Sequence, residues 1–232
     1  MKVEIITLFP DFFISPLKVG RLNKALEQKN LKIKIHNLFD YGKGSYKQVD
    51  DRPYGGGPGM VLMIEPIWKV LKKIKAETGR KEEKIVLLSA SGQLFNQKKA
   101  EEYSKLKRLI LICGHFEGVD ERVTQYLVDE EISIGNYVLS GGEPAALVVL
   151  DATVRLIEGV VGKEESLTEE SFQITNNEKQ TLVEYPQYTR PENFKGMKVP
   201  EVLLSGNHQE IKKWRLKQAL FKTKKNRPDL IK

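Results

Sequence analysis

A glycine-rich run with two carboxylates and a guanidinium stands out near residue 50. It reads Asp50-Asp51-Arg52-Pro53-Tyr54-Gly55-Gly56-Gly57-Pro58-Gly59-Met60. Four glycines within five positions let the backbone approach a ligand or another chain closely, and they accept positive φ angles. A structural turn explains the glycines but not the adjacent carboxylates and Arg52, so we favour a functional loop. The run is neither a Walker loop, which needs Gly-Lys-Ser/Thr, nor a dinucleotide-binding fingerprint.

Three further glycine-containing segments each follow a predicted strand. They are Ser89-Ala90-Ser91-Gly92, Gly114-His115-Phe116-Glu117-Gly118-Val119-Asp120-Glu121-Arg122 and Ile134-Gly135-Asn136-Tyr137-Val138-Leu139-Ser140-Gly141-Gly142-Glu143. In open α/β sheets, ligands bind beyond the carboxyl ends of the strands, where glycines free backbone groups for hydrogen bonding. Turns often contain glycine, so each segment alone is weak evidence. Together they predict a site for one adenosine-sized ligand.

The elements that must position these segments alternate along the chain. Strand-like runs span residues 3–9, 31–38, 84–89, 108–113 and 131–139, and helix-like stretches span 16–28, 66–77, 96–106 and 119–128. Such alternation predicts a parallel sheet with helices on both faces.

The rest of the chain divides by composition. Residues 144–161 predict a helix that is apolar nearly all round and therefore needs a second surface, such as a subunit interface, to cover it. Residues 162–179 are polar and acidic, which is typical of a flexible linker. We therefore expect a domain over 1–161, a linker over 162–179, and a basic helical domain over 180–232 with a helix at 207–224.

The charge of the chain is concentrated at one end. The formal net charge is +7, and residues 172–232 hold 13 Lys and Arg against 6 Asp and Glu, which accounts for the whole excess. This distribution favours a nucleic-acid-binding module over a merely soluble basic surface.

The single cysteine, Cys113, excludes an internal disulfide and a cysteine-rich zinc site. The absence of a long apolar run or leader predicts a cytoplasmic protein without a membrane partner.

The motifs resemble those of the bacterial tRNA (guanine-N1)-methyltransferases, the TrmD type among the knotted SPOUT methyltransferases. They are DDRPYGGGPGM from Asp50, CGHFEGVDER from Cys113, SIGNYVLSGGE from Ser133, YPQYTRPE from Tyr185 and VLLSGNHQEIKKWRLKQ from Val202, and the likeness runs from Ile5 to the end. The resemblance implies a SPOUT-type parallel sheet with a C-terminal trefoil knot, followed by a small, mainly helical domain. Packing rules alone would predict an unknotted sheet.

The resemblance also implies the ligands and the assembly. The methyl donor would be S-adenosylmethionine, the product N1-methylguanosine 3′ of the anticodon in tRNA, and the working unit a homodimer with active sites at the subunit interface. In relatives a divalent ion can assist catalysis, although the sequence shows no dedicated metal-ligand cluster. The matching cofactor-binding positions are Leu87, Leu88, Ser89, Ala90, Gly92, Gly114, Phe116, Glu117, Gly118, Ser133, Ile134, Gly135, Tyr137, Val138, Leu139, Gly141 and Gly142.

Two residues match the family's catalytic positions. Guanine N1 carries a proton at neutral pH, so the reaction needs a base for this proton and a cation for the charge developing on O6. By resemblance these are Glu170 and Arg155, although the family's usual residue at the position of Glu170 is aspartate. Glu169 is an alternative base. Solvated linker carboxylates and an Arg155–Asp151 pair are the structural alternatives.

The remaining candidates contact RNA. Asp50, Arg52 and Gly59 are candidates for holding the target base or its neighbour, and the charges of Arg190, Lys212, Arg215 and Lys217 in the C-terminal domain suit phosphate contacts. Many relatives continue for a further helix beyond the Arg227 region, so we expect a weaker C-terminal domain or a weaker hold on tRNA here, with the cofactor site intact. Two other hypotheses remain open, a catalytically weakened RNA-binding homologue and a knotted methyltransferase acting on another RNA position. The least favoured hypothesis is an unrelated nucleotide-dependent enzyme, because the Walker and dinucleotide motifs are absent.

Overall fold

The computed structural model describes residues 1–160, 170–172, 174–175 and 180–231. The chain divides into two compact units, Met1–Val161 and Gly162–Lys232. Among the described residues, none of the helices combines the length and the apolar composition that crossing a bilayer requires.

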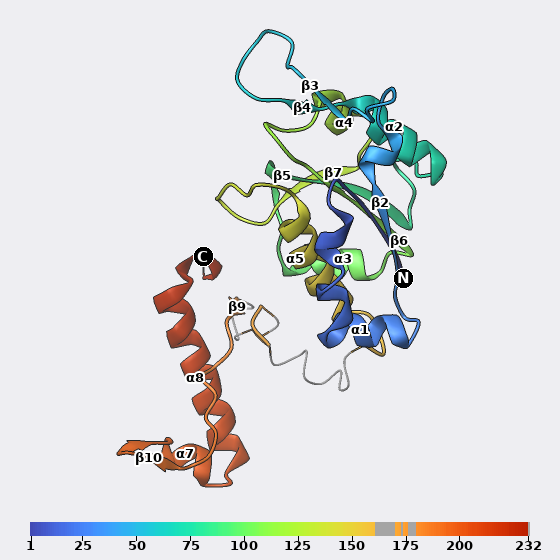
Figure 1. The fold of residues 1–232 in the computed structure, drawn as a ribbon. Helices are drawn as coiled ribbons and strands as arrows, with labels where there is room; N and C mark the ends of the chain where they lie inside the picture. The colour runs from blue at the N-terminus through green and yellow to red at the C-terminus, as the bar shows by residue number, and fades with distance from the viewer. Residues whose placement is uncertain (161–169, 173, 176–179, 232) are drawn as a thin grey trace. The chain divides into compact units, whose positions relative to one another are not determined.

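A five-stranded parallel sheet forms the centre of the first unit (Figure 1). Its strands are β1 (Lys2–Thr7), β2 (Lys32–Asn37), β5 (Glu83–Leu94), β6 (Arg108–Cys113) and β7 (Glu130–Ser133), in the order β2-β1-β6-β5-β7. All four strand pairs are parallel, so the carboxyl ends of the strands meet at one edge of the sheet. The predicted parallel sheet is confirmed.

Helices cover both faces of this sheet because its central strands are apolar on both sides. One core contains Val3, Val86 and Leu111 with α1 (Gly20–Glu27), α3 (Gln97–Ser104) and α5 (Glu143–Val154). The other core contains Ile6 and Ile112 with η3 (Leu38–Tyr41), α2 (Ile64–Lys73) and α4 (Glu121–Tyr126). Two short 3-10 helices, η1 (Pro10–Phe13) and η2 (Pro16–Lys18), link β1 to α1.

Several predicted boundaries are wrong. The run expected to be helical from residue 16 is divided into η2 and α1, and Gly20, the first residue of α1, has a φ of +63°. The apolar helix predicted over 144–161 ends at Val154. Strand β7 ends at Ser133, and the apolar residues after it form a loop, whereas β5 continues to Leu94 after a shift of register opposite β7.

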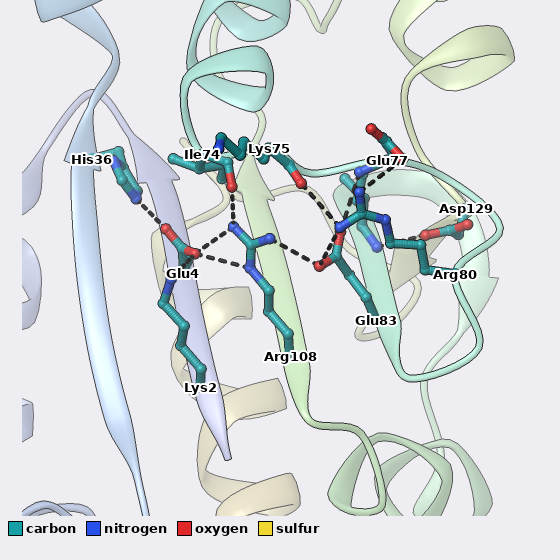
Figure 2. Close-up of polar contacts among 11 residues, drawn as sticks. Lys2, Glu4, His36, Ile74, Lys75, Glu77, Arg80, Glu83, Arg108 and Asp129 are labelled. Carbon is teal, nitrogen blue, oxygen red and sulfur yellow. Dashed lines mark hydrogen bonds and ion pairs between the residues drawn. The ribbon is translucent and has the colours of Figure 1, made fainter.

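A buried ion network joins the amino-terminal ends of three strands (Figure 2). The Glu4 side chain is fully buried, and its carboxylate accepts hydrogen bonds from His36 Nε2 at 2.6 Å and from Arg108 Nε at 2.9 Å. Arg108 Nη1 also donates to Glu83 on β5 at 2.8 Å. Because β1 and β5 both neighbour β6, Arg108 neutralises carboxylates on each side and ties the three strands together.

The second unit has a small core on one long helix. Its elements are β8 (Ile174–Thr175), β9 (Thr181–Leu182), β10 (Asn193–Phe194), β11 (Met197–Lys198), α7 (Glu201–Leu204), α8 (His208–Asn226) and η4 (Pro228–Leu230). Leu182 and Tyr185 are buried against Ala219 of α8. Most of the predicted linker over 162–179 lies outside the described residues, and the described part includes β8.

Candidate functional site

A pocket of about 350 Å³ lies at the carboxyl ends of β5, β6 and β7. Its walls are residues 87–91 within β5, the segment from Gly114 to Val119 after β6, and the segment after β7 that includes Ile134, Gly135 and residues 137–142. Because the three strands are neighbours in a parallel sheet, their carboxyl ends converge, as ligand sites of open α/β sheets do. The volume suits a ligand of the size of a nucleoside.

Close backbone approach explains the glycines of this pocket. A Cβ on Gly142 would lie 2.7 Å from the Cys113 Cα atom, and one on Gly114 would lie 3.0 Å from the Leu88 carbonyl oxygen. The Gly142 amide donates to the Gly114 carbonyl at 2.8 Å. The loop after β7 is therefore pressed against the loop after β6, and side chains at these positions would force the two loops apart.

The structure gathers sixteen of the seventeen predicted cofactor-binding residues round this pocket. The exception is Gly92, which lies in β5 and does not line it. A Cβ on Gly92 would lie 2.4 Å from the Ile132 backbone nitrogen, so this glycine permits the close pairing of β5 with β7. Strand pairing, not ligand binding, therefore explains the glycine at position 92. Its position after a predicted strand could not distinguish these two explanations.

Sequence reasoning missed nine residues that line the pocket. They are Ser91, His115, Val119, Glu121, Thr124, Glu131, Ile132, Ser140 and Ala145. Five of them, Ser91, His115, Val119, Glu121 and Ser140, lie inside the singled-out segments and could have been included. Glu131 and Thr124 carried no such signal, because they belong to a strand and a helix. Glu131 accepts a hydrogen bond from Ser91 Oγ at 2.9 Å, which adds a carboxylate to the pocket wall.

A buried carboxylate lies behind the pocket. Glu143 is 3% exposed at the first turn of α5, where the helix dipole favours negative charge. It accepts a hydrogen bond from Thr7 Oγ1 at 2.6 Å, and Thr7 Oγ1 accepts from the Phe9 amide at 2.9 Å. Burial is the main cause that raises the pKa of the Cys113 thiol, and the charge of Glu143 raises this pKa further. Cys113 is therefore a core residue and not a nucleophile.

The glycine-rich loop of residues 50–60 is attached to the rim of the pocket. Strands β3 (Asp50–Asp51) and β4 (Val61–Leu62) pair at its base, and the Met60 carbonyl accepts from the Glu117 amide at 3.0 Å. Gly59 has a φ of +77°, and a Cβ there would lie 2.3 Å from Glu117 Cγ. The positive φ favours glycine at position 59, and a side chain there would also displace the exposed Glu117 side chain, while Asp50 and Arg52 lie on the same loop.

Of the two predicted catalytic residues, Arg155 lies away from this pocket and Glu170 belongs to the second unit. Arg155 follows the last residue of α5, whereas the pocket adjoins the first turn of that helix. At 1.5 Å per residue, the helix separates the two by about 20 Å. Glu170 belongs to the second unit, and Glu169 lies outside the described residues.

The predicted RNA contacts of the second unit differ in exposure. Arg190, Lys212 and Lys217 are exposed. Arg215 is partly buried, with its guanidinium 4.7 Å from the Tyr185 ring centre, so it packs in the unit's core region. Trp214 is partly buried, and its ring centre lies 6.3 Å from that of Tyr188.

In the part of the chain that the structure describes, His, Cys, Asp and Glu side chains form no three-residue cluster suited to a metal ion.

Comparison with known proteins covers the full length of the chain. The family model described as tRNA (Guanine-1)-methyltransferase TrmD matches residues 1–232. A tRNA (guanine-N(1)-)-methyltransferase from Dictyoglomus turgidum is 52% identical over 231 residues, which cover 100% of this chain and 90% of that protein. Proteins with the same description from Carboxydothermus hydrogenoformans and Bacillus cereus are 50% and 47% identical, and in each case the match covers 100% of this chain and 88% or 92% of the relative.

Proposed function

Since this chain belongs to the tRNA (guanine-1)-methyltransferase TrmD family, we infer that it is an enzyme that methylates N1 of guanine in tRNA, and we propose that this guanosine lies 3′ of the anticodon. The observation that carries this conclusion is the full-length match to the family, at about half identity to named relatives. The gathering of the glycine segments round one pocket supports it, because a methyltransferase needs a site for its methyl donor.

S-adenosylmethionine fits the pocket as methyl donor. The pocket has the volume for an adenosine group, and its walls offer backbone amides and carbonyls where glycines leave them uncovered. Glu117 and Glu131 place carboxylates on the wall, suited to ribose hydroxyls or to a positively charged group. The donor would supply an activated methyl group on a sulfonium.

The chain's own residues would prepare guanine N1 for attack. Glu170 would accept the N1 proton, and Arg155 would stabilise the negative charge that develops on O6 as the proton leaves. The N1 lone pair then forms the new bond to the methyl carbon while the bond from that carbon to sulfur breaks. Asp50 and Arg52, on the loop beside the pocket rim, would hold the target base or its neighbour.

A homodimer would bring these groups together. Arg155 is separated from the pocket of its own chain by the length of α5, so a second subunit is the simplest source of the Arg155 that meets each pocket. Apolar side chains left exposed on this unit, including Val138 at 88% and Val148 at 47%, are suited to such an interface. A trefoil knot, which the family resemblance implies, is consistent with the close packing of the loops after β6 and β7.

The deciding experiment measures methyl transfer and its position. Purified protein is incubated with radiolabelled S-adenosylmethionine and unmodified tRNA carrying guanosine 3′ of the anticodon, preceded by another guanosine. A transcript with the target guanosine replaced by adenosine is the control. We expect label as N1-methylguanosine in the first tRNA only, and a reduction of about 100-fold or more in kcat for Glu170→Gln, since general-base catalysis contributes about that factor.

Each alternative predicts a different result. Label at another nucleotide would indicate a different RNA target. Retained tRNA binding without label would indicate a weakened RNA-binding homologue and contradict the proposal. Full activity of Glu170→Gln would remove Glu170 from the catalytic role but leave the reaction unaffected.

A further inference from the structure

Basic and aromatic side chains gather on the two segments that flank the glycine-rich loop in sequence. We call this area the flanking surface. It comprises residues 39–47 and 64–75, with Lys43, Lys47, Lys69, Lys72, Lys73 and Lys75, and with Phe39, Tyr41, Tyr46 and Trp68. Asp40 and Glu65 are the carboxylates within these two ranges, so six lysines against two carboxylates leave an excess of four positive charges.

The two segments form one continuous surface because they pack on a common core. Leu38 of η3 and Ile67, Val70 and Leu71 of α2 are buried in the same apolar cluster. Above this core, the Lys73 ammonium lies 5.2 Å from the centre of the Tyr41 ring, which joins the two segments directly. The pKa of Glu65 in the first turn of α2 is lowered mainly by its hydrogen bond to Lys69, and the charge of Lys43 is the smallest of the causes.

Pairing within the surface leaves most of its positive charge uncompensated. Lys69 binds Glu65 at 2.8 Å and Lys47 binds Asp40 at 3.2 Å. The dipole of α2 favours lysines in its last turn and so accounts for Lys72 and Lys73. It does not account for Lys43 or Lys47, which lie outside the helix. Like charges held this close repel one another unless an anionic partner covers them.

Exposed aromatic rings are interleaved with these lysines. Tyr46 is 95% exposed and Trp68 is 45% exposed, although a large apolar ring is usually more buried in a soluble protein. The Lys72 ammonium lies 4.7 Å from the centre of the Trp68 ring, which holds this charge at the surface. Lysines that meet phosphates, combined with rings that stack on bases or riboses, are the features with which proteins bind RNA.

The backbone connects this surface to the rim of the pocket. The Val49 carbonyl accepts from the Met63 amide at 2.8 Å, closing the base of the glycine-rich loop between the two flanking segments. Next to it, the Leu62 amide donates to the Gly118 carbonyl at 3.0 Å, and Gly118 lines the pocket. A polyanion on the flanking surface would therefore pass directly beside Asp50, Arg52 and the pocket.

We propose that the flanking surface binds the phosphate backbone of the tRNA substrate next to the target guanosine, so that the cofactor-binding unit itself holds the RNA. This proposal rests on the proposed function for the identity of the RNA. It adds a second electrostatic contact to the basic second unit, on a first unit that itself has 24 Lys and Arg against 21 Asp and Glu, a net charge of +3. Each lysine that neutralises a phosphate releases counterions and makes binding more dependent on salt.

The test compares two triple variants that remove the same charge. In the first, Lys43→Gln, Lys69→Gln and Lys72→Gln are combined in the flanking surface. In the matched control, Lys24→Gln, Lys98→Gln and Lys105→Gln remove exposed lysines on or beside α1 and α3, which cover the opposite face of the sheet. A third variant replaces the first three lysines by arginine and keeps the charge. For each protein, tRNA affinity is measured at several salt concentrations, together with KM, kcat and the affinity for S-adenosylmethionine.

For the glutamine variant of the flanking surface, we expect the slope of log affinity against log salt to become shallower by about 2 to 3, or about 0.7 to 0.9 per phosphate contact. KM for tRNA should rise by about ten-fold or more, while the affinity for S-adenosylmethionine stays unchanged and shows that the fold is intact. The control and the arginine variant should keep the original slope.

Equal salt slopes for the two glutamine variants would overturn the proposal. If wild-type protein transferred no methyl group to tRNA, the proposed function would fail instead, and the salt slope of tRNA binding would still decide whether the surface contacts RNA.

Discussion

The buried carboxylate Glu4 controls how stability responds to acid. Burial opposes its charged form, but hydrogen bonds from Lys2, His36 and Arg108 outweigh this cost and lower its pKa from 4.5 to about 2. Burial also lowers the pKa of His36, more than Glu4 raises it, so the imidazole is neutral in the folded protein at neutral pH. The network therefore joins one carboxylate and one neutral histidine to Arg108 (Figure 2).

Both shifts predict that the protein loses stability as the pH falls. A group with a lowered pKa in the fold contributes stability above its unfolded pKa, and this contribution is lost as the unfolded state takes up protons. The decline should begin near pH 6.5 through His36 and increase below pH 4.5 through Glu4, which contributes up to about 3 kcal/mol by pH 2. Urea unfolding between pH 7 and pH 3 measures it. Glu4→Gln should be less stable at pH 7 and show a smaller change below pH 4.5; an unchanged pH dependence would contradict this assignment.

The element that sequence reasoning placed worst is the loop after β7. Residues 131–139 are mostly apolar and predict a strand, yet the strand ends at Ser133 and Gly135 takes a φ of +159°. Val138 is 88% exposed, so its apolar character does not serve the core of this unit. A periodicity argument assumes that apolar residues are buried within the same chain, and this loop violates that assumption.

Other features were predicted correctly from the residues that form them. Strand β6 was predicted with its observed bounds because all its side chains after Arg108 are apolar and buried on both faces. The pocket was predictable because glycine-containing segments follow β6 and β7, whose carboxyl ends meet beside β5. The pocket residues on β7 and α4, such as Glu131 and Thr124, were not predictable, since only the strand order places these elements beside it.

The packing of two loops at Gly142 can be tested directly. Its φ of −79° is accessible to alanine, so the cost of Gly142→Ala comes from the Cβ, which would lie 2.7 Å from the Cys113 Cα atom. We expect a loss of about 1 to 3 kcal/mol in stability and an affinity for S-adenosylmethionine at least about ten-fold weaker, because the pocket wall must shift. Thermal unfolding and calorimetric titration measure the two effects.

Gly20→Ala is the control for this variant. Gly20 has a φ of +63° but open space around it, so alanine there should lower stability by about 1 kcal/mol or more without changing the affinity for S-adenosylmethionine. Equal affinities in the two variants would show that the close approach at Gly142 does not shape the pocket.

At the scale of the whole molecule, the distribution of charge looks different in sequence and in space. Counted along the chain, the excess positive charge lies in residues 172–232, and the preceding residues are balanced. The structure brings residues 39–47 and 64–75 together, because η3 and α2 pack on one core, and the lysines of these segments form a local excess that the count averages with acidic residues elsewhere. Segment totals therefore identified one basic region of the protein and missed the other.

The proposed dimer makes a quantitative prediction, because the pocket and Arg155 lie at opposite ends of α5. If each active site combines the pocket of one subunit with Arg155 of the other, Arg155→Ala and Gly142→Ala impair different halves of the site. A mixed dimer of the two variants then has one site with both halves intact and one with neither. Random exchange of equal amounts yields about half mixed dimers, so activity should recover to about a quarter of the wild-type value.

Methyl transfer to tRNA is measured after equal amounts of the two variants are unfolded and refolded together, without separation of the mixed dimers. Each variant refolded alone is the control and should stay near its own low activity. If Arg155 acted on the pocket of its own chain, every site in the mixed dimer would carry one defect, and mixing would restore nothing. A monomeric protein would give the same lack of recovery, and sedimentation would distinguish the two cases. Recovery near a quarter would therefore establish both the dimer and the exchange of Arg155 between its subunits.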